Sequence, residues 1–203
     1  MEVEVKLRLK DSTAHKTLTS LLSPYLAKTY LQENFFFDTQ NSLLSSNLAA
    51  LRIRFYDLDS RSVLSLKAQP IIQSGISRVE EQEESLDVEL ARHCVLDPTR
   101  LLGPLLSGSM IMRRVKEEFG VRDGFLCLGG FRNVRGVYEW RGLKLEIDET
   151  IYDFGTCYEV ECESVEPERD REVIVGFLEE KGIEYEYSQV SKFAVFMSGK
   201  LPH

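Results

Sequence analysis

The first ten residues, MEVEVKLRLK, alternate between apolar and charged side chains from Glu2 onward without a break. Successive side chains of a β-strand point to opposite faces, so this period of two predicts a strand with one apolar and one charged face. The charged face carries two carboxylates and then three cations: Glu2, Glu4, Lys6, Arg8 and Lys10. Such a face either meets bulk water or forms one wall of a binding site.

The same alternation recurs along the chain and predicts a protein built mainly from antiparallel strands. We expect strands at residues 2–10, 28–37, 49–57, 62–69, 76–85, 124–140, 143–151 and 156–164. Eight strands joined by hairpins can close into a barrel, which removes the exposed edges and leaves room for one small ligand. An open, twisted sheet with helices on one face would show the same pattern.

Helical periodicity appears between and after these strands. We expect a helix capped by Ser12, one helical turn near Leu43, a helix opened by Glu166-Pro167-Glu168, and a short helix at 188–198. Residues 87–120 repeat Leu, Ile and Met at helical spacing, which indicates a helical insertion. The chain of 203 residues needs only one domain. We therefore expect an α+β fold, with a closed eight-stranded antiparallel β-barrel (a tunnel), helices packed outside, and a single domain over 1–203.

Charges of one sign stand together on single strands, as in Glu2/Glu4, Arg52/Arg54 and Glu159/Glu161. Like charges side by side repel each other, and solubility gives no reason to prefer that arrangement. Clustered carboxylates bind hard cations such as Mg²⁺, and clustered Arg and Lys bind phosphate oxygens. A barrel lined in this way would bind a metal–polyphosphate complex, and we expect its charges to be compensated only when that ligand is present.

Other classes of function fit the sequence poorly. A protein that binds duplex nucleic acid normally has a basic surface, and the net charge of −8 does not indicate one. There is no G-x-x-x-x-G-K-[S/T] loop, and the histidines do not fall into a pattern with Ser or Cys. The four cysteines form no C-x-x-C pair, and no apolar run approaches the ~18 residues of a membrane span. Together with an initial strand that leaves no place for a signal peptide, this predicts a cytoplasmic protein with reduced thiols.

Glu2-x-Glu4-x-Lys6 resembles the ExExK signature of the CYTH superfamily, the triphosphate tunnel metalloenzymes. That motif alone fits many strands, but further blocks of the family pattern follow in the same order along nearly the whole chain. They are Arg52-x-Arg54, Lys67, Glu81-x-Glu83 after Arg78, Arg135-x-x-Tyr138, Asp148 with Gly155 and Glu159-x-Glu161, and Ser191-Lys192-Phe193. The resemblance is greatest to the short plant members, which are inorganic triphosphatases.

The resemblance implies metal-dependent hydrolysis of inorganic tripolyphosphate to diphosphate and orthophosphate, with Mg²⁺ or Mn²⁺ as cofactor. It assigns a catalytic role to Glu81, Glu83 and Lys6. It assigns phosphate binding to Lys6, Arg52, Arg54, Lys67, Arg135 and Lys192. It assigns the metal to Glu2, Glu4, Asp148, Glu159 and Glu161, with Glu146 close by. The sequence leaves open whether Arg78, Arg113, Arg114 and Arg132 face the tunnel.

Two alternatives share the same charged barrel. The first is an enzyme acting on an organic triphosphate, either an adenylate cyclase or a thiamine triphosphatase. The second is a polyphosphate-binding protein without activity, although an anion binder has no need for so many carboxylates. In each case the expected partner is a small-molecule triphosphate rather than a nucleic acid or a membrane, and we expect a monomer or weak dimer.

Overall fold

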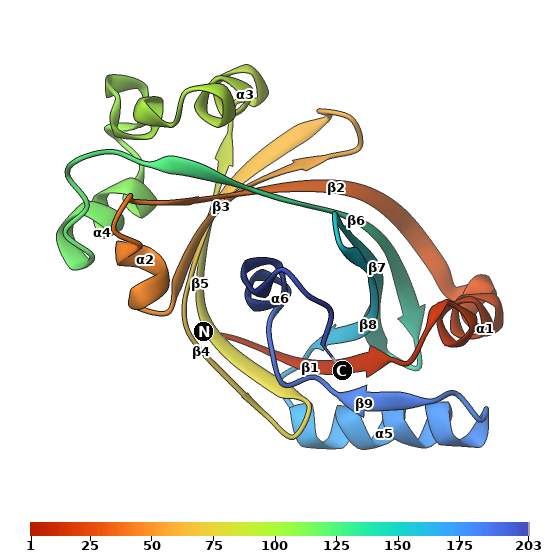
Figure 1. Ribbon diagram of the computed structural model, residues 1–203. Helices are drawn as coiled ribbons and strands as arrows, with labels where there is room; N and C mark the ends of the chain where they lie inside the picture. The colour runs from red at the N-terminus through yellow and green to blue at the C-terminus, as the bar shows by residue number, and fades with distance from the viewer. Residues whose placement is uncertain (203) are drawn as a thin grey trace. The chain divides into compact units, whose positions relative to one another are not determined.

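The structure, a computed structural model, describes residues 1–202 and consists mainly of β-strands (Figure 1). The strands are β1 (Glu2–Leu9), β2 (Leu26–Asp38), β3 (Ala49–Tyr56), β4 (Arg61–Gln73), β5 (Ile76–Leu86), β6 (Leu126–Trp140), β7 (Leu143–Tyr152), β8 (Gly155–Glu163) and β9 (Tyr185–Tyr187). The α-helices are α1 (Ser12–Leu22), α2 (Leu43–Ser46), α3 (Val88–Leu96), α4 (Met110–Glu118), α5 (Pro167–Glu180) and α6 (Lys192–Ser198). Short 3-10 helices are η1 (Ser23–Tyr25), η2 (Pro98–Leu102) and η3 (Pro104–Leu106).

The strands form one sheet in the order β5-β4-β3-β2-β6-β7-β8-β1-β9, and β5 also pairs with β1. That additional pairing closes eight strands into a ring, and β9 pairs with β1 at the end of the strand order. The pairings of β3 with β2 and β4, of β7 with β6 and β8, and of β1 with β8 and β9 are antiparallel. The predicted α+β fold with a closed eight-stranded antiparallel barrel is confirmed.

The contacts within the chain divide it into two compact units. Unit 1 comprises Met1–Leu31, Ile71–Arg78 and the chain from Arg132 onward, and unit 2 comprises Gln32–Pro70 and Val79–Phe131. The single domain over 1–203 stays a prediction. No helix in residues 1–202 is both long enough and apolar enough to span a membrane.

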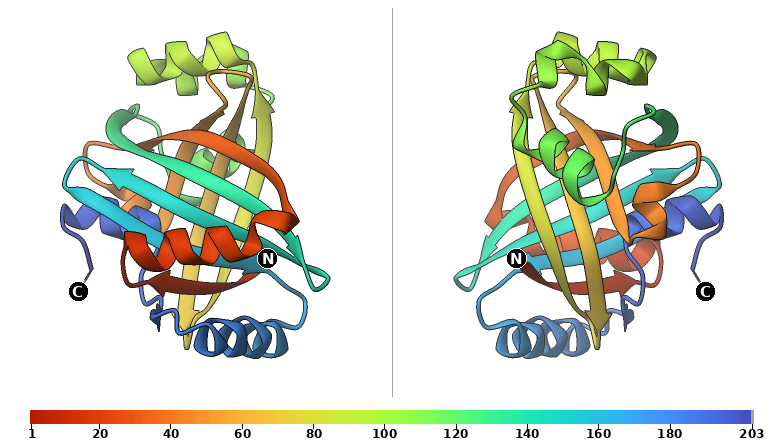
Figure 2. Two further views of the ribbon diagram at one scale, coloured as in Figure 1. Left: turned by 90° about the vertical axis from the view of Figure 1, so that its right-hand side faces the viewer. Right: turned by 90° about the vertical axis from the view of Figure 1, so that its left-hand side faces the viewer.

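In unit 1, one face of strands β6, β7, β8 and β1 is apolar and carries the core. Val5, Leu7, Val160 and Ile147 are buried there with Leu178 of α5. Helix α1 lies across β7 and β8 on this face (Figure 2), and α5 lies beside β1 and β9. Helix α6 lies on the opposite face of β1 and β8 (Figure 1), which is the charged one. The alternation in MEVEVKLRLK therefore separates a core from a polar face.

In unit 2, the apolar faces of β3 and β4 pack against the helical insertion. Leu51, Ile53 and Leu66 are fully buried together with Ile111 and Val115 of α4. Over the range of the predicted helical insertion, 87–120, the structure has α3, η2, η3 and α4. Pro98 and Pro104 each begin a 3-10 segment, because proline lacks the N–H that would continue the preceding helix.

Two local predictions were wrong. The N-cap of α1 is Asp11 rather than Ser12, since its Oδ1 accepts hydrogen bonds from the backbone N–H groups of Thr13 and Ala14 at 2.8 and 2.9 Å. The last helix begins at Lys192 rather than at 188, and Tyr185–Tyr187, where no strand was predicted, form the short strand β9 against β1. Three residues are too few for a periodic pattern to reveal.

Gly130 of β6 lies against the backbone of β2 in unit 2. A Cβ atom at this position would stand 1.7 Å from the carbonyl oxygen of Asn34 and 3.2 Å from the Cα of Phe35. Both neighbours are backbone atoms, so no side chain can rotate away to make space. Glycine is therefore required here for the close approach of the chain rather than for an unusual dihedral angle.

We predict that Gly130→Ala destabilises the protein by about 1–3 kcal/mol or more, because the two strands must separate to admit the methyl group. Thermal denaturation followed by circular dichroism measures the change. Gly176→Ala is the matched control, since Gly176 lies within α5 with open space around it, and alanine there should stabilise the helix by up to about 1 kcal/mol. Equal melting temperatures for Gly130→Ala and the wild type would contradict the prediction.

Candidate functional site

Unit 1 gathers charged side chains on one face of four neighbouring strands. Two rows of directly opposed residues cross β6, β7, β8 and β1: Arg135, Asp148, Glu159 and Arg8, and beside them Val137, Glu146, Glu161 and Lys6. The two middle strands carry carboxylates, and the outer strands carry the cations. Opposite charges therefore meet between β6 and β7 and between β8 and β1, whereas the carboxylates of β7 and β8 stand opposite each other.

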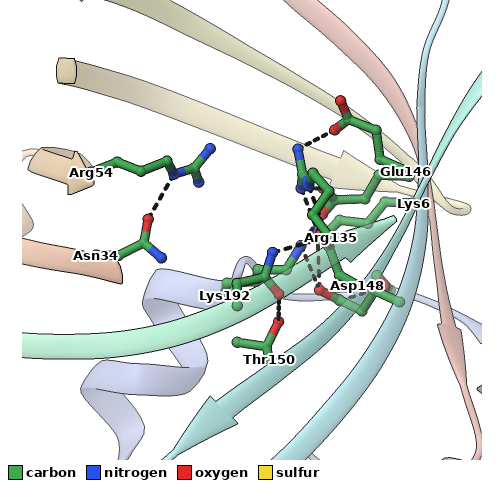
Figure 3. A network of polar contacts seen from close by, with 12 residues as sticks. Lys6, Asn34, Arg54, Arg135, Glu146, Asp148, Thr150 and Lys192 are labelled. Atoms are coloured by element: carbon green, nitrogen blue, oxygen red, sulfur yellow. Dashed lines mark hydrogen bonds and ion pairs between the residues drawn. The ribbon is translucent and has the colours of Figure 1, made fainter. Parts of the chain in front are cut away.

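Lys192, the first residue of α6, brings a further cation to this face (Figure 3). Its Nζ atom lies 2.7 Å from Asp148 Oδ2 and 3.1 Å from Glu159 Oε2, and it also contacts Glu161 Oε1. The helix start is held by Ser191, whose Oγ accepts a hydrogen bond from the Ala194 N–H at 3.1 Å. Three carboxylates from two strands thus converge on one ammonium group.

Lys6 contacts two of the same carboxylates. Its Nζ atom is 3.3 Å from Glu159 Oε2 and is paired with Glu161 Oε1. The Lys6, Glu159 and Glu161 residues are 2–5% exposed, which leaves little water to replace these contacts. The two lysines therefore share the oxygen atoms of one pair of glutamates.

Arg135 completes the network from β6. Its Nε and Nη2 atoms donate to the two oxygens of Asp148 at 2.8 and 2.6 Å, a two-point contact that suits the planar guanidinium. Nη2 also donates to Glu161 at 2.6 Å, and Nη1 pairs with Glu146. Asn133 adds a hydrogen bond from its Nδ2 to Asp148 Oδ1 at 2.9 Å. The fully buried Asp148 is thus satisfied on both oxygens.

These neighbours keep the carboxylates ionised. Burial by itself would raise the pKa of Asp148, but Arg135 and Lys192 outweigh it and lower the pKa to about 2. In the same way Lys192, Lys6 and Arg135 overcome burial and hold the pKa of Glu161 well below its usual range. Burial would lower the pKa of Lys192, yet the three carboxylates around it raise that pKa well above its usual value.

One expectation from the sequence was wrong for this unit. We expected the charges to be compensated only when a metal–phosphate ligand is present. The four carboxylates and four cations of the two rows and α6 instead pair with one another: Glu146, Asp148, Glu159 and Glu161 with Lys6, Arg8, Arg135 and Lys192. Lysine and arginine side chains from neighbouring elements supply the counter-charge.

Arg8 belongs to this network although it was not among the predicted site residues. Its Nη2 atom lies 3.5 Å from Glu159 Oε1, which also accepts a hydrogen bond from Ser188 Oγ at 3.2 Å. The sequence could have indicated Arg8, because it lies two residues after Lys6 and therefore on the same face of the first strand. Ser188 had no comparable signal, because a single serine at the start of the expected helix does not indicate which side chain it will bind.

The five predicted metal ligands are carboxylates on the same face of unit 1. Glu2 and Glu4 lie half-buried on β1, and Glu4 helps to raise the pKa of Lys6, although burial opposes that rise. Within residues 1–202, no group of three or more Asp, Glu, His or Cys side chains is arranged to hold a metal ion. The oxygens of Asp148, Glu159 and Glu161 contact lysine ammonium groups, so the metal set stays a prediction.

Unit 2 has its own charged face, on β3, β4 and β5. Arg52 donates from Nε to Ser65 Oγ at 3.0 Å, and its Nη2 atom lies 3.5 Å from both Glu81 and Glu83. Lys67 Nζ lies 3.2 Å from Glu81 Oε2. Burial, together with the neighbouring Arg54, lowers the pKa of Arg52 to about 10. Four of the predicted residues thus form a second cluster.

Arg54 is held differently from Arg52. Its Nε atom donates to Asn34 Oδ1 at 2.8 Å (Figure 3). Its Nη1 atom contacts the Tyr56 hydroxyl at 3.4 Å. Both partners are neutral side chains on the same face of β2 and β3. Neither was predicted, because a buried Asn or Tyr in a strand gives no sign of its partner.

The arginines whose direction the sequence left open contact other groups. Arg78 pairs with Glu168 of α5 at 3.1 Å, and Arg114 pairs with Glu80 at 2.6 Å. The side chain of Arg113 contacts Met110 on the same helix. Arg132 is exposed and lies three residues before Arg135 on β6, so the two side chains point to opposite faces of the strand. Arg78, Arg113 and Arg114 thus contact Glu168, Met110 and Glu80, which lie outside the two charged clusters.

Comparison with known proteins gives the family. The sequence pattern of the CYTH domain matches residues 1–196. The chain belongs to the CYTH family. The resemblance seen in the ExExK motif and the blocks that follow it is therefore confirmed, and the CYTH match extends from β1 into α6. Comparison with curated proteins gave no significant match.

Solved structures of similar proteins agree with this CYTH assignment. HpAC1 from Hippeastrum, a candidate adenylyl cyclase described as having a dominant triphosphatase activity, is 55% identical, with a TM-score of 0.96 over 100% of this chain and 98% of that chain. A candidate adenylate cyclase from Bacillus halodurans is 20% identical, with a TM-score of 0.74 over 96% and 98%. The PH1819 protein of Pyrococcus horikoshii is 17% identical, with a TM-score of 0.61 over 97% and 99%. The last two show the fold alone.

We predict that Asp148→Asn lowers the free energy of unfolding at pH 7 by about 2 kcal/mol, because the folded-state pKa lies below the usual value of 3.8. A lowered carboxyl pKa stabilises the folded state above about pH 4, and this contribution is lost as the pH falls toward 2. The difference between variant and wild type should therefore shrink over that range. Urea denaturation from pH 7 to pH 2 in EDTA measures it, with the exposed Asp153→Asn as control. A difference that does not depend on pH would contradict the prediction.

Proposed function

We propose that this CYTH protein is a triphosphatase that hydrolyses inorganic tripolyphosphate to diphosphate and orthophosphate. The observation that carries the proposal is the 55% identity, over essentially both whole chains, to HpAC1, a protein described as having a dominant triphosphatase activity. The two charged clusters support it, because each presents basic side chains of the kind that bind phosphate oxygens.

The chemistry asked of the protein is mainly electrostatic. Transfer of a phosphoryl group to water needs neutralisation of phosphate charge and correct placement of the water, and it needs no protein nucleophile. We propose that the predicted cations serve this purpose: Lys6, Arg135 and Lys192 in unit 1, and Arg52, Arg54 and Lys67 in unit 2. Fixed cations stabilise the charge that develops on the leaving phosphate at no cost of reorganisation.

Glu81 and Glu83 are the proposed groups that orient the attacking water. The side chain of Glu81 is 15% exposed and paired with Arg52 and Lys67, whereas that of Glu83 is 46% exposed and touches Arg52 only at 3.5 Å. An exposed carboxylate with one long contact keeps lone pairs available to accept a hydrogen bond from water. We therefore propose that Glu83 orients the attacking water and that Glu81 holds Arg52 in position.

A divalent cation fits the donor set by its chemistry. Mg²⁺ and Mn²⁺ prefer carboxylate oxygens, and the converging oxygens of unit 1 are of that kind. The residues that would hold it are Glu2, Glu4, Asp148, Glu159 and Glu161. When bound, such an ion supplies positive charge to the phosphate oxygens. Lys6 and Lys192 contact three of these carboxylates and would have to share their oxygens.

The remaining predictions belong to the same proposal. We propose one functional domain over 1–203, a cytoplasmic location, and a monomer or weak dimer. Light scattering after size-exclusion chromatography measures the mass against the 23.3 kDa of one chain. A tetramer would overturn the last of these.

The experiment that tests the function is phosphate release from tripolyphosphate, ATP and thiamine triphosphate, each with Mg²⁺, Mn²⁺ or EDTA, together with a measurement of cyclic AMP. Rapid release from tripolyphosphate that EDTA abolishes is the expected result. Cyclic AMP from ATP as the main product would assign the protein to the cyclases, and release from thiamine triphosphate alone would name another substrate. Binding without turnover would make it a polyphosphate-binding protein.

We predict that the double variant Glu2→Gln/Glu4→Gln loses metal-supported turnover of tripolyphosphate, because the amides keep the shape of the side chains and remove the charge that a divalent cation needs. Phosphate release over a range of Mg²⁺ and Mn²⁺ concentrations measures it, and Glu117→Gln on the exposed side of α4 is the control. Full activity of the double variant would overturn the assignment of these two residues to the metal.

We predict that Arg52→Ala raises the KM for tripolyphosphate about tenfold or more, because a charge-assisted contact with phosphate is lost. The fold should remain intact, since the side chain lies on the charged face rather than in the core of unit 2. Steady-state kinetics and thermal denaturation measure the two effects, with the exposed Arg100→Ala as control. Unchanged kinetic constants would remove Arg52 from the substrate-binding set.

A further inference from the structure

The three arginines assigned to phosphate binding differ in how their charge is balanced. Arg135 contacts three carboxylates, those of Glu146, Asp148 and Glu161. Arg52 lies 3.5 Å from both Glu81 and Glu83. Arg54 makes no ion pair within the part of the chain that the structure describes, and its partners are the neutral side chains of Asn34 and Tyr56. Its positive charge is therefore the least compensated of the three.

Asn34 holds Arg54 through an amide whose two ends have different tasks. Its Oδ1 accepts the hydrogen bond from Arg54 Nε at 2.8 Å, and its Nδ2 donates to the backbone carbonyl of Phe131 at 3.3 Å. A guanidinium can only donate and a carbonyl can only accept, so these partners determine the orientation of the amide. Asn34 is 1% exposed, and neither bond can be replaced by water. A carboxylate in its place would present an oxygen to the carbonyl, and alanine would satisfy neither partner.

The position of the Asn34 backbone is restricted as well as that of its side chain. Gly130, next to Phe131, leaves the space in which the Asn34 carbonyl lies, since a Cβ there would be 1.7 Å from that oxygen. Asn34 and Arg54 are also directly opposed in the register of β2 and β3. Glycine, carbonyl and amide thus fix the position from which Arg54 Nε is bound.

We infer that Asn34 is a positioning residue that fixes the Arg54 guanidinium without neutralising it, so that its charge is reserved for the phosphates of the substrate. The inference rests on the proposed function, because it assumes that Arg54 binds triphosphate. The bond uses Nε, and within residues 1–202 only Nη1 of the two terminal nitrogens has a partner, the Tyr56 hydroxyl at 3.4 Å. An anion can therefore meet Nη2 and Nη1 with little to displace. A neutral anchor serves this purpose better than a carboxylate, which would compete with phosphate for the same cation.

The test compares Asn34→Asp, Asn34→Ala and Arg54→Ala with the double variant Asn34→Asp/Arg54→Ala. We expect Asn34→Asp to raise the KM for tripolyphosphate about tenfold or more, with a smaller change in kcat, because the new carboxylate pairs with Arg54. Asn34→Asp and Asn34→Ala both lose the bond to Phe131. We therefore expect the KM of Asn34→Asp to exceed that of Asn34→Ala, and the difference between the two measures the effect of the added charge. In the Arg54→Ala background, Asn34→Asp should change KM by less than about twofold.

Asn47→Asp is the matched control, since Asn47 is an exposed residue of the same unit and the substitution adds the same charge. Thermal denaturation of each variant separates loss of folding from loss of binding. If Asn34 had a purely structural role, Asn34→Ala would raise KM at least as much as Asn34→Asp does. Alternatively, the fold-change in KM of the double variant would equal the product of the fold-changes of Asn34→Asp and Arg54→Ala. Either result would overturn the inference.

The proposed function has a separate test in the wild type. Isothermal titration of tripolyphosphate into the wild-type protein shows binding even if turnover is absent, and the same ranking of variants then applies to Kd. Absence of both binding and turnover in the wild type would refute the triphosphate function itself. Normal wild-type turnover with an unchanged KM in Asn34→Asp would refute only the role of Asn34.

Discussion

The buried ion pairs around Asp148 are the interaction on which unit 1 depends. Asp148 is fully buried; Arg135 from β6 contacts both of its oxygens, and Lys192 from α6 contacts Oδ2. Removing ions from water is costly, and the cost is offset only where every charge has a well-placed partner. A shift of one residue in the register of β7 would turn Asp148 toward the apolar core. The network therefore requires one alignment of the strands and one position for the start of α6.

Arg54 of unit 2 is held differently from the cations of unit 1, and the difference bears on function. In unit 1, Lys6 and Lys192 are surrounded by carboxylates, and together with Arg8 and Arg135 they balance the charge of four carboxylates. In unit 2, Arg54 is held by the amide of Asn34 and keeps its charge. A paired cation stabilises the fold, and a phosphate must compete for it with its partners. An unpaired cation destabilises the empty protein slightly and gains more from an anion, which favours binding.

The same carboxylates serve both stability and the proposed metal site, so the two demands are coupled. Glu159 and Glu161 bind the ammonium groups of Lys6 and Lys192 with the oxygens that a divalent cation would take. If a divalent cation took these oxygens, Lys6 and Lys192 would become available to pair with phosphate. Proteins often use strained or costly charge clusters at functional sites, and the rest of the fold must provide the stability that such clusters lack.

The sequence by itself determined the strands, their polar faces and the family. A period of two decides which side chains share a face, and this alone places Glu159 and Glu161 together on one side of their strand. Only the tertiary structure decided which charges pair. The contacts of Lys192 with Asp148, and of Arg54 with Asn34, join residues from different elements, and their geometry depends on strand register and packing. Those are properties of the assembled sheet, because alternation along one strand carries no information about the neighbour that will lie beside it.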